Sequence, residues 1–131
     1  MIDVTCAIIF RENKILATQR GRGGHLEGFW EFPGGKIEPE ESAEECIVRE
    51  IFEELEIQVV VLRKLTPVEH HYPDKSIRLH PFICRIDAGE IRLKDHAALC
   101  WLEAGELDAL NWAAADRRIV EDREIKKLNS R

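Results

Sequence analysis

The sequence lacks any long hydrophobic run. Nothing in its 131 residues approaches the roughly 20 consecutive apolar residues that a membrane-spanning helix needs. The first ten residues carry the acidic Asp3 and no basic start, which is unlike a secretory leader. We therefore expect an untargeted, cytoplasmic protein with no membrane partner.

Paired cysteines are also missing. The four cysteines lie far apart, with no Cys-x-x-Cys pair and no accompanying histidine spacing. This pattern argues against a structural zinc site and against a disulfide framework. We expect four reduced and mostly buried thiols, at Cys6, Cys46, Cys84 and Cys100.

Basic residues are in deficit. Lysine and arginine number 19 against 25 aspartates and glutamates, for a formal net charge of -6. Duplex DNA or RNA is therefore not expected as a partner, because binding to the phosphate backbone needs a basic face. The acid is concentrated, with nine glutamates within residues 38–56. Such crowding fits a site that collects multivalent cations, and a cation-mediated route to phosphate suits an acidic protein.

The chain length suits one compact domain, residues 1–131. A capping box from Ser42 to Glu45 predicts the start of a helix over residues 43–55. A helical turn is expected at 104–107, and an amphipathic pattern predicts a closing helix over 116–128. Apolar and β-branched runs predict strands at residues 4–10, 14–19, 29–32, 58–65, 77–86 and 98–102. This order of elements indicates an α/β sandwich.

The predicted helix at 43–55 carries three carboxylates at helical spacing. Glu50, Glu53 and Glu54 are three and four positions apart and are expected to project together. Hard oxygen ligands suit magnesium or manganese. The alternative is a solvated acidic face with Arg49 and nearby lysines as ion-pair partners. On the opposite face, the residues expected to turn toward the core are Ile47, Val48, Ile51 and Leu55.

The wider pattern resembles the Nudix box. Gly35 is followed after five residues by Glu41, and after seven more by Arg49-Glu50-Ile51-Phe52-Glu53-Glu54-Leu55-Glu56-Ile57. One position departs, because Glu56 stands where the box has the glycine that ends the helix. A left-handed Glu56 would cost about 1 kcal/mol, which a fold tolerates. The match fixes many positions, so it is far more specific than a short glycine motif.

The resemblance implies a Nudix fold, an α/β/α sandwich whose mixed sheet lies between a catalytic helix and a C-terminal helix. It implies that Glu50, Glu53 and Glu54 bind Mg²⁺, with Mn²⁺ as a possible substitute. The carbonyl of Gly34 or Gly35 is implied as a further ligand, and these glycines are expected to let the backbone turn tightly and approach the cation. Arg49 would orient the carboxylates, and Glu41 would brace the loop and helix behind them.

Residues outside the box are similar to the MutT-type nucleoside triphosphatases and the related CTP pyrophosphohydrolases, notably 17–20, 30–38 and 72–75. The likeness implies hydrolysis of a nucleoside or deoxynucleoside triphosphate to a monophosphate and pyrophosphate. CTP, dCTP or 8-oxo-dGTP would be the substrate, and pool sanitation the role. Glu50 or Glu53 is the first candidate for the general base. Asp95 is the second, with a turn aspartate as its alternative.

Base selection is expected on the other side of the cleft. Asp116 is informative, because MutT-type enzymes that prefer oxidised guanine have asparagine there and CTP-type relatives have aspartate; the alternative is an N-cap. Phe32 is either a base contact or core. Trp101 and Trp112 are expected to pack, and His70, His71 and His80 are not expected to bind metal. The candidate substrate contacts are Arg20, Phe32, Tyr72, Lys75 and Asp116.

Two other functions stay open at this point. One is a Nudix hydrolase of a nucleoside diphosphate derivative, such as ADP-ribose or a dinucleotide. The other is a non-catalytic module that only binds a nucleotide, although such a module has no need of three intact glutamates. The pattern leaves both a monomer and a homodimer possible.

Overall fold

Two long parallel strands form the centre of the molecule. The computed structural model describes residues 1–122 and 125. Strand β1 (Ile2–Arg11) runs parallel to β6 (Ser76–Ala88), with Ile2 opposite Ile77 and Phe10 opposite Arg85. Strand β4 (Gln58–Lys64) continues the sheet antiparallel to β6. The mixed sheet expected from the sequence is therefore present.

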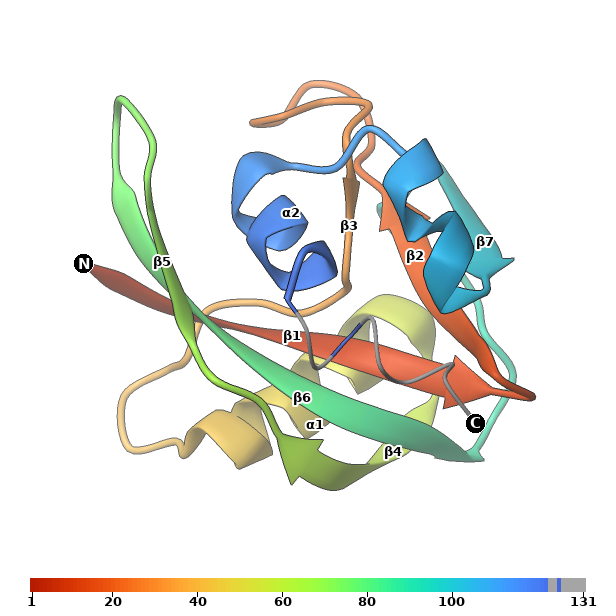
Figure 1. Cartoon of the computed structure of the whole chain (residues 1–131). Coiled ribbons are helices and arrows are strands. Elements are labelled where there is room, and N and C mark those ends of the chain that lie inside the picture. The colour runs from red at the N-terminus through yellow and green to blue at the C-terminus, as the bar shows by residue number, and fades with distance from the viewer. Residues whose placement is uncertain (123–124, 126–131) are drawn as a thin grey trace.

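A second set of strands diverges from the first. Strand β2 (Lys14–Gln19) pairs with β1 only at the hairpin end. It then pairs antiparallel with β3 (Trp30–Glu31) on one side and with β7 (Ala98–Leu102) on the other. Figure 1 shows β2, β3 and β7 rising away from β1 and β6. The two sets of strands diverge, and a cavity lies between them.

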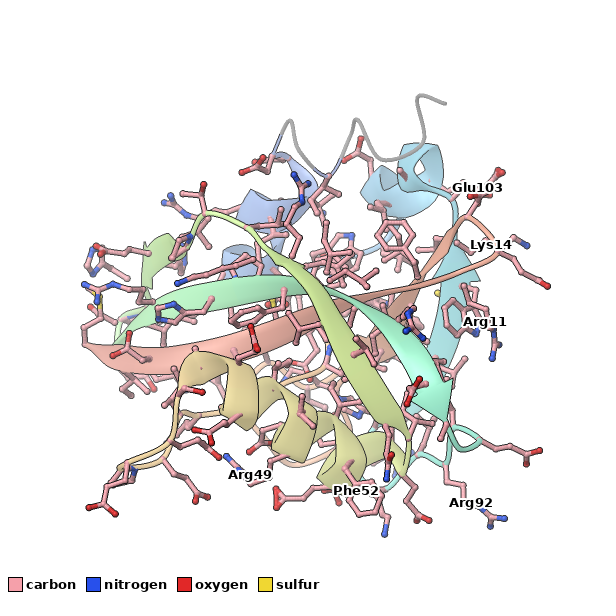
Figure 2. The ribbon with its side chains drawn as sticks, turned by 90° about the horizontal axis from the view of Figure 1, so that it is seen from below. Arg11, Lys14, Arg49, Phe52, Arg92 and Glu103 are labelled. Atoms are coloured by element: carbon pink, nitrogen blue, oxygen red, sulfur yellow. The ribbon has the colours of Figure 1, made fainter. Side chains whose placement is uncertain are left out.

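Helices cover both faces of the central strands. Helix α1 (Ala43–Leu55) lies on one face, and the 3₁₀ helix η1 (Ala104–Ala109) and helix α2 (Ala114–Val120) lie on the other, as Figure 2 shows. Successive β1 residues face opposite sides, so Ala7 and Ile9 pack with α1 while Cys6 and Ile8 pack beneath α2. The α/β sandwich is confirmed. None of the helices in the described part of the chain is long and apolar enough to cross a membrane.

Helix α1 begins as the sequence predicts. Ser42 Oγ accepts a 3.0 Å hydrogen bond from the Glu45 amide, and Glu45 Oε1 accepts one of 2.8 Å from the Ser42 amide. The expected inward position of Val48 is wrong, because its side chain is 38% exposed. Cys46 takes the place of Val48 in the buried stripe. The stripe consists of Cys46, Ile47, Ile51 and Leu55.

The other differences concern element ends. The closing helix starts at Ala114, two residues before the predicted Asp116, and residues 123–124 and 126–128 of that prediction lie outside the described residues. The short strand β5 (Val68–His71) was not predicted, and Pro67 and Pro73 lie on either side of it. These prolines flank the strand, where a missing amide donor does no harm. The four cysteines are free, Trp112 is buried, and Trp101 packs under Arg11.

Glu56 ends α1 in the left-handed conformation, with φ 59° and ψ 27°. We expect Glu56→Gly to raise the free energy of unfolding by about 1 kcal/mol, because glycine carries no Cβ penalty there. The exposed ion pair with Lys94 that is lost contributes little. Urea denaturation measures the change. Glu44→Gly, placed in the helical part of α1, is the control and should destabilise; a loss of stability at Glu56 as well would contradict the expectation.

Candidate functional site

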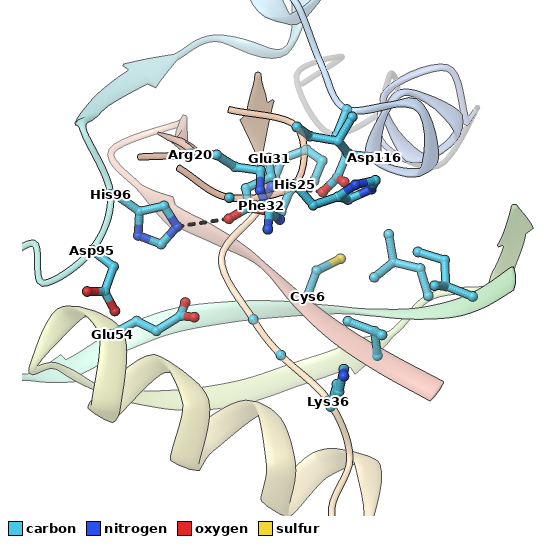
Figure 3. A pocket seen from close by; sticks show the side chains of 18 of the residues that line it. Cys6, Arg20, His25, Glu31, Phe32, Lys36, Glu54, Asp95, His96 and Asp116 are labelled. Carbon is cyan, nitrogen blue, oxygen red and sulfur yellow. Dashed lines mark hydrogen bonds and ion pairs between the residues drawn. The ribbon is translucent and has the colours of Figure 1, made fainter. Parts of the chain in front are cut away.

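A cavity of about 410 Å³ opens between the two sets of strands. Its walls come from β1, from the loop between β2 and β3, from the C-terminal end of α1, from the β5–β6 hairpin and from the start of α2 (Figure 3). The sequence-predicted site residues that line it are Arg20, Phe32, Gly34, Gly35, Glu54, Tyr72, Lys75, Asp95 and Asp116. Four others do not line it: Glu41, Arg49, Glu50 and Glu53.

These four form a cluster around one guanidinium. Arg49 Nε and Nη2 donate to the two carboxylate oxygens of Glu41 at 2.6 and 3.0 Å. Arg49 Nη1 donates to Glu50 at 2.9 Å and to Glu53 at 2.7 Å. The hydrogen bonds from Arg49 hold the pKa of Glu41 down, at about 2, and those to Glu41 raise the pKa of Arg49. Arg49 thus fixes three carboxylates of the acidic segment in one arrangement.

Glu54 points the other way, into the cavity. Its Oε1 is buried and has no hydrogen-bond partner. Burial, together with the nearby charges of Glu31, Glu50 and Asp95, raises the pKa of Glu54 to about 8. The predicted convergence of three glutamates is therefore not what this structure contains. Arg49 draws Glu50 and Glu53 to itself, and in residues 1–122 and 125 no three His, Cys, Asp or Glu side chains are arranged to hold a metal ion.

Gly34 and Gly35 follow β1 so closely that neither has room for a side chain. Thr5 donates its amide to the Gly35 carbonyl at 2.7 Å and Ala7 donates to Pro33 at 2.8 Å. A Cβ on Gly34 would overlap the Thr5 backbone, and one on Gly35 would overlap the Glu50 carboxylate. Neither glycine has a positive φ. The structure assigns no turn at these two residues, so close approach of neighbouring atoms is what requires glycine here, and their approach to a cation stays a prediction.

Glu31 connects two further side chains at the cavity, and the sequence reasoning gave it no role. Its Oε1 accepts a 2.7 Å hydrogen bond from Arg20, and its Oε2 lies 2.9 Å from Nε2 of the buried His96. Figure 3 shows His96 directed at Glu31, with Asp95 and Glu54 below it. Glu31 lies within the 30–38 segment that resembles MutT-type enzymes, and His96 directly follows the candidate base Asp95. Their pairing is a tertiary contact that spacing does not reveal.

Asp116 occupies the opposite end of the cavity. Its Oδ2 accepts a 2.9 Å hydrogen bond from the Phe32 amide, and the residue is only 8% exposed. Burial, and then the charge of Glu31, raise the pKa of Asp116 to about 8. The N-cap alternative is wrong, because the N-cap of α2 is Ala113. Asp116 lies in the first turn of the helix and aims its carboxyl into the cavity wall.

Aromatic side chains complete this end. The Phe32 ring packs on Trp112 with centroids 4.6 Å apart, so Phe32 is both core and cavity wall. The Tyr72 hydroxyl accepts a 3.1 Å hydrogen bond from the Ala115 amide. The rings of Tyr72 and His25 are T-shaped to one another, with centroids 5.2 Å apart. His25 comes from the β2–β3 loop. Four cationic residues also line the cavity: Arg20, Arg22, Lys36 and Lys75. A flat, partly polar ligand with an anionic tail would match this distribution.

The raised pKa of Asp116 predicts a pH effect on stability. Between its unfolded pKa near 4 and its folded value of about 8, the folded protein binds a proton that the unfolded chain lacks. Stability therefore falls as the pH rises through this window, by an amount on the order of a few kcal/mol. Asp116→Asn keeps the acceptor for Phe32 but cannot ionise. We expect thermal melting between pH 5 and pH 8 to show a weaker pH dependence for the variant, and parallel curves would refute this.

Comparison with known proteins identifies a family and relatives for this chain. Residues 4–122 match the model of the NUDIX domain family. The chain is 36% identical to the CTP pyrophosphohydrolase of Escherichia coli, covering 92% of this chain and 90% of that protein. It is 30% identical to the 8-oxo-dGTP diphosphatase of Escherichia coli, covering 91% and 93%. Among solved structures, the Escherichia coli ORF135 protein superposes with a TM-score of 0.84 at 34% identity, covering 100% of this chain and 93% of that one.

Proposed function

The chain belongs to the Nudix domain family, and from that premise we propose that it hydrolyses nucleoside triphosphates to a nucleoside monophosphate and pyrophosphate. The observation that carries the proposal is the position of Glu54, a buried carboxyl with an unpartnered oxygen at one end of a cavity. The other end, with Asp116, Phe32 and Tyr72, presents aromatic rings and a carboxyl group that would suit a nucleotide base. A cavity of about 410 Å³ is in the range that small-molecule sites occupy.

The residues around Glu54 fit a divalent cation. An oxygen buried without a partner and surrounded by other carboxylates is the environment in which a hard cation replaces a proton. We assign Mg²⁺, with Mn²⁺ as a substitute, to Glu54 and the Gly34 carbonyl, together with Glu50 and Glu53, whose carboxylates would have to turn from Arg49 toward Glu54 to reach the ion. Gly35 is the weaker ligand, since its carbonyl already accepts from the Thr5 amide and hydroxyl. When bound, such an ion neutralises phosphate charge and acidifies water.

The side chains around the proposed metal site have separate roles. Arg49 holds Glu50 and Glu53 in place, and Glu41 fixes Arg49 from behind. Asp95 is the better candidate for the general base, because it lines the cavity while Glu50 and Glu53 are bonded to Arg49. Its carboxylate would take the proton from the attacking water. Arg20 and Lys75 would bind phosphate from the rim.

Asp116 would read the base. With its pKa near 8, the carboxyl is protonated at neutral pH and can donate a hydrogen bond to a ring nitrogen or carbonyl. The amide of Phe32 already occupies Oδ2, so the other oxygen is the one we expect to meet the ligand. Cytosine and oxidised guanine both offer an acceptor, and the relatives named for CTP and for 8-oxo-dGTP make these the first substrates to test.

A substrate panel tests the proposal directly. The purified protein is incubated with Mg²⁺ and with the eight common NTPs and dNTPs, 8-oxo-dGTP, 5-methyl-dCTP, ADP-ribose and a diadenosine polyphosphate, and pyrophosphate and orthophosphate are measured separately. We expect pyrophosphate from a triphosphate, with the highest kcat/KM for a cytidine nucleotide or 8-oxo-dGTP, and loss of activity with EDTA. Turnover confined to ADP-ribose or the dinucleotide, or none, would overturn the substrate class.

A further inference from the structure

His96 has a buried imidazole at the cavity that the roles above leave unused. Its side chain is 7% exposed. Nε2 lies 2.9 Å from Glu31 Oε2, and Nδ1 is buried without a partner. An ionised carboxylate only accepts hydrogen bonds, so Nε2 carries the proton and donates. In the neutral ring Nδ1 then carries only an acceptor lone pair. A buried lone pair without a partner costs less free energy than a buried N–H without one.

The same carboxylate holds Arg20. Arg20 lies directly after β2, and its Nη1 donates to Glu31 Oε1 at 2.7 Å. The two oxygens of Glu31 are thus bound by side chains from two different segments. His96 constrains one oxygen and thereby fixes the direction in which the other faces. Arg20 has five N–H donors, and the Glu31 contact accounts for one nitrogen. The rest of the guanidinium remains available at the cavity rim.

Without His96, the Glu31 side chain would be held by fewer contacts. Its charge raises the pKa of Glu54 and the pKa of Asp116, so either carboxyl repels Glu31 whenever it ionises. A single hydrogen bond from Arg20, whose side chain is 35% exposed, leaves both partners free to swing toward solvent. Two hydrogen bonds from opposite sides prevent this. A guanidinium held in advance also loses less entropy when it binds an anion.

We propose that His96 is a positioning residue that acts through Glu31 to hold the Arg20 guanidinium where it binds a phosphate of the nucleotide. This rests on the proposed function, because it takes the ligand to be a triphosphate. His96 itself does not touch the substrate. Its loss is therefore expected to raise KM while kcat changes little, the pattern for an interaction present in both ground state and transition state. A residue that merely anchored the Asp95 loop would lower kcat instead.

Two substitutions of His96 distinguish the contribution of Nε2 from that of Nδ1. Glutamine places its amide at the reach of Nε2, and asparagine places it at the reach of Nδ1. We expect His96→Asn to raise KM about tenfold, the scale of one charge-assisted hydrogen bond, and His96→Gln to recover most of that loss. His80 is a matched control outside the cavity, since its Nε2 lies 2.9 Å from Asp3 and its Nδ1 is also buried without a partner. His80→Asn and His80→Gln should leave KM unchanged.

A double-mutant cycle identifies the route. If His96 acts through Arg20, His96→Asn adds nothing to KM in an Arg20→Ala background. The assays use CTP and 8-oxo-dGTP, and calorimetry measures the affinity of inorganic tripolyphosphate for each variant. Additive effects, equal effects of the two His96 variants, or a fall in kcat alone would overturn the inference. If the wild-type protein cleaves neither nucleotide, the proposed function fails, but the affinity for tripolyphosphate still tests the role of His96. A loss of affinity in His96→Asn but not in His96→Gln supports that role. Equal affinities of the two variants, or no binding of tripolyphosphate, refute it.

Discussion

Replacing Glu54 with glutamine should lower kcat by at least about 100-fold, the usual scale for losing a charged group that acts at the reacting centre. The structure explains why the fold should survive. With a pKa near 8, Glu54 is protonated at neutral pH in the metal-free protein. Glutamine matches the neutral acid in shape and charge. The variant should therefore melt at the wild-type temperature or slightly above it without metal.

The raised pKa supplies a second, independent readout for Glu54. Because a cation must displace the Glu54 proton, metal binding to wild type should release protons at pH 7, and the variant should release fewer. Calorimetry in buffers of different ionisation enthalpy measures this release. Glu44→Gln, an exposed position on the same helix, is the control and should keep full activity. Turnover by Glu54→Gln within threefold of wild type would remove Glu54 from the site.

Gly35→Ala should inactivate the protein while leaving its stability nearly unchanged, and Gly34→Ala should destabilise the fold. The two neighbours differ in what a new methyl group would meet. At Gly35 it meets the Glu50 carboxylate, the mobile end of a side chain, which can move away at small cost. Moving Glu50 breaks its contact with Arg49 and displaces a carboxylate from the proposed metal site, so we expect kcat to fall at least about 100-fold.

At Gly34 the methyl group meets the backbone of Thr5 and Cys6 in β1, which cannot yield without distorting the central strand. The expected loss is about 1–3 kcal/mol or more, the range for overpacking a rigid interior. Thermal melting and activity together distinguish the two variants. Gly105→Ala, where a Cβ would meet nothing, is the control. Equal stability losses at Gly34 and Gly35, or full activity of Gly35→Ala, would contradict this account.

Local patterns predicted much of the fold because local physics produces those features. The capping box starts α1 at Ala43, as Ser42 and Glu45 indicated, since both partners lie within one turn. The long apolar runs of β1 and β6 formed strands, because both faces of those strands are covered by helices. Glu56 adopts the left-handed conformation where the box pattern places a glycine. Each of these depends on neighbours within a few residues.

The same local reasoning failed where distant partners compete. Helical spacing alone predicts that Glu50, Glu53 and Glu54 project together. Spacing fixes where side chains start on the helix, whereas the charges and cavities around them decide where their ends lie. Arg49 binds two of the three, and burial turns the third into the cavity. The N-cap alternative for Asp116 failed for the same reason, because its partner Phe32 is 84 residues away in the chain.

By itself, then, the sequence determined the family, the helix that carries the acidic residues and the alternation of strands that builds the sheet, because box spacing and hydrophobic period are local quantities. Only the tertiary structure decided how the site is divided. It placed Glu54 and Asp95 at one end, Asp116 and Phe32 at the other, and His96 and Glu31 between them. That division follows from the divergence of β2 from β1, which opens the cavity, and no local pattern encodes the contacts across such an opening.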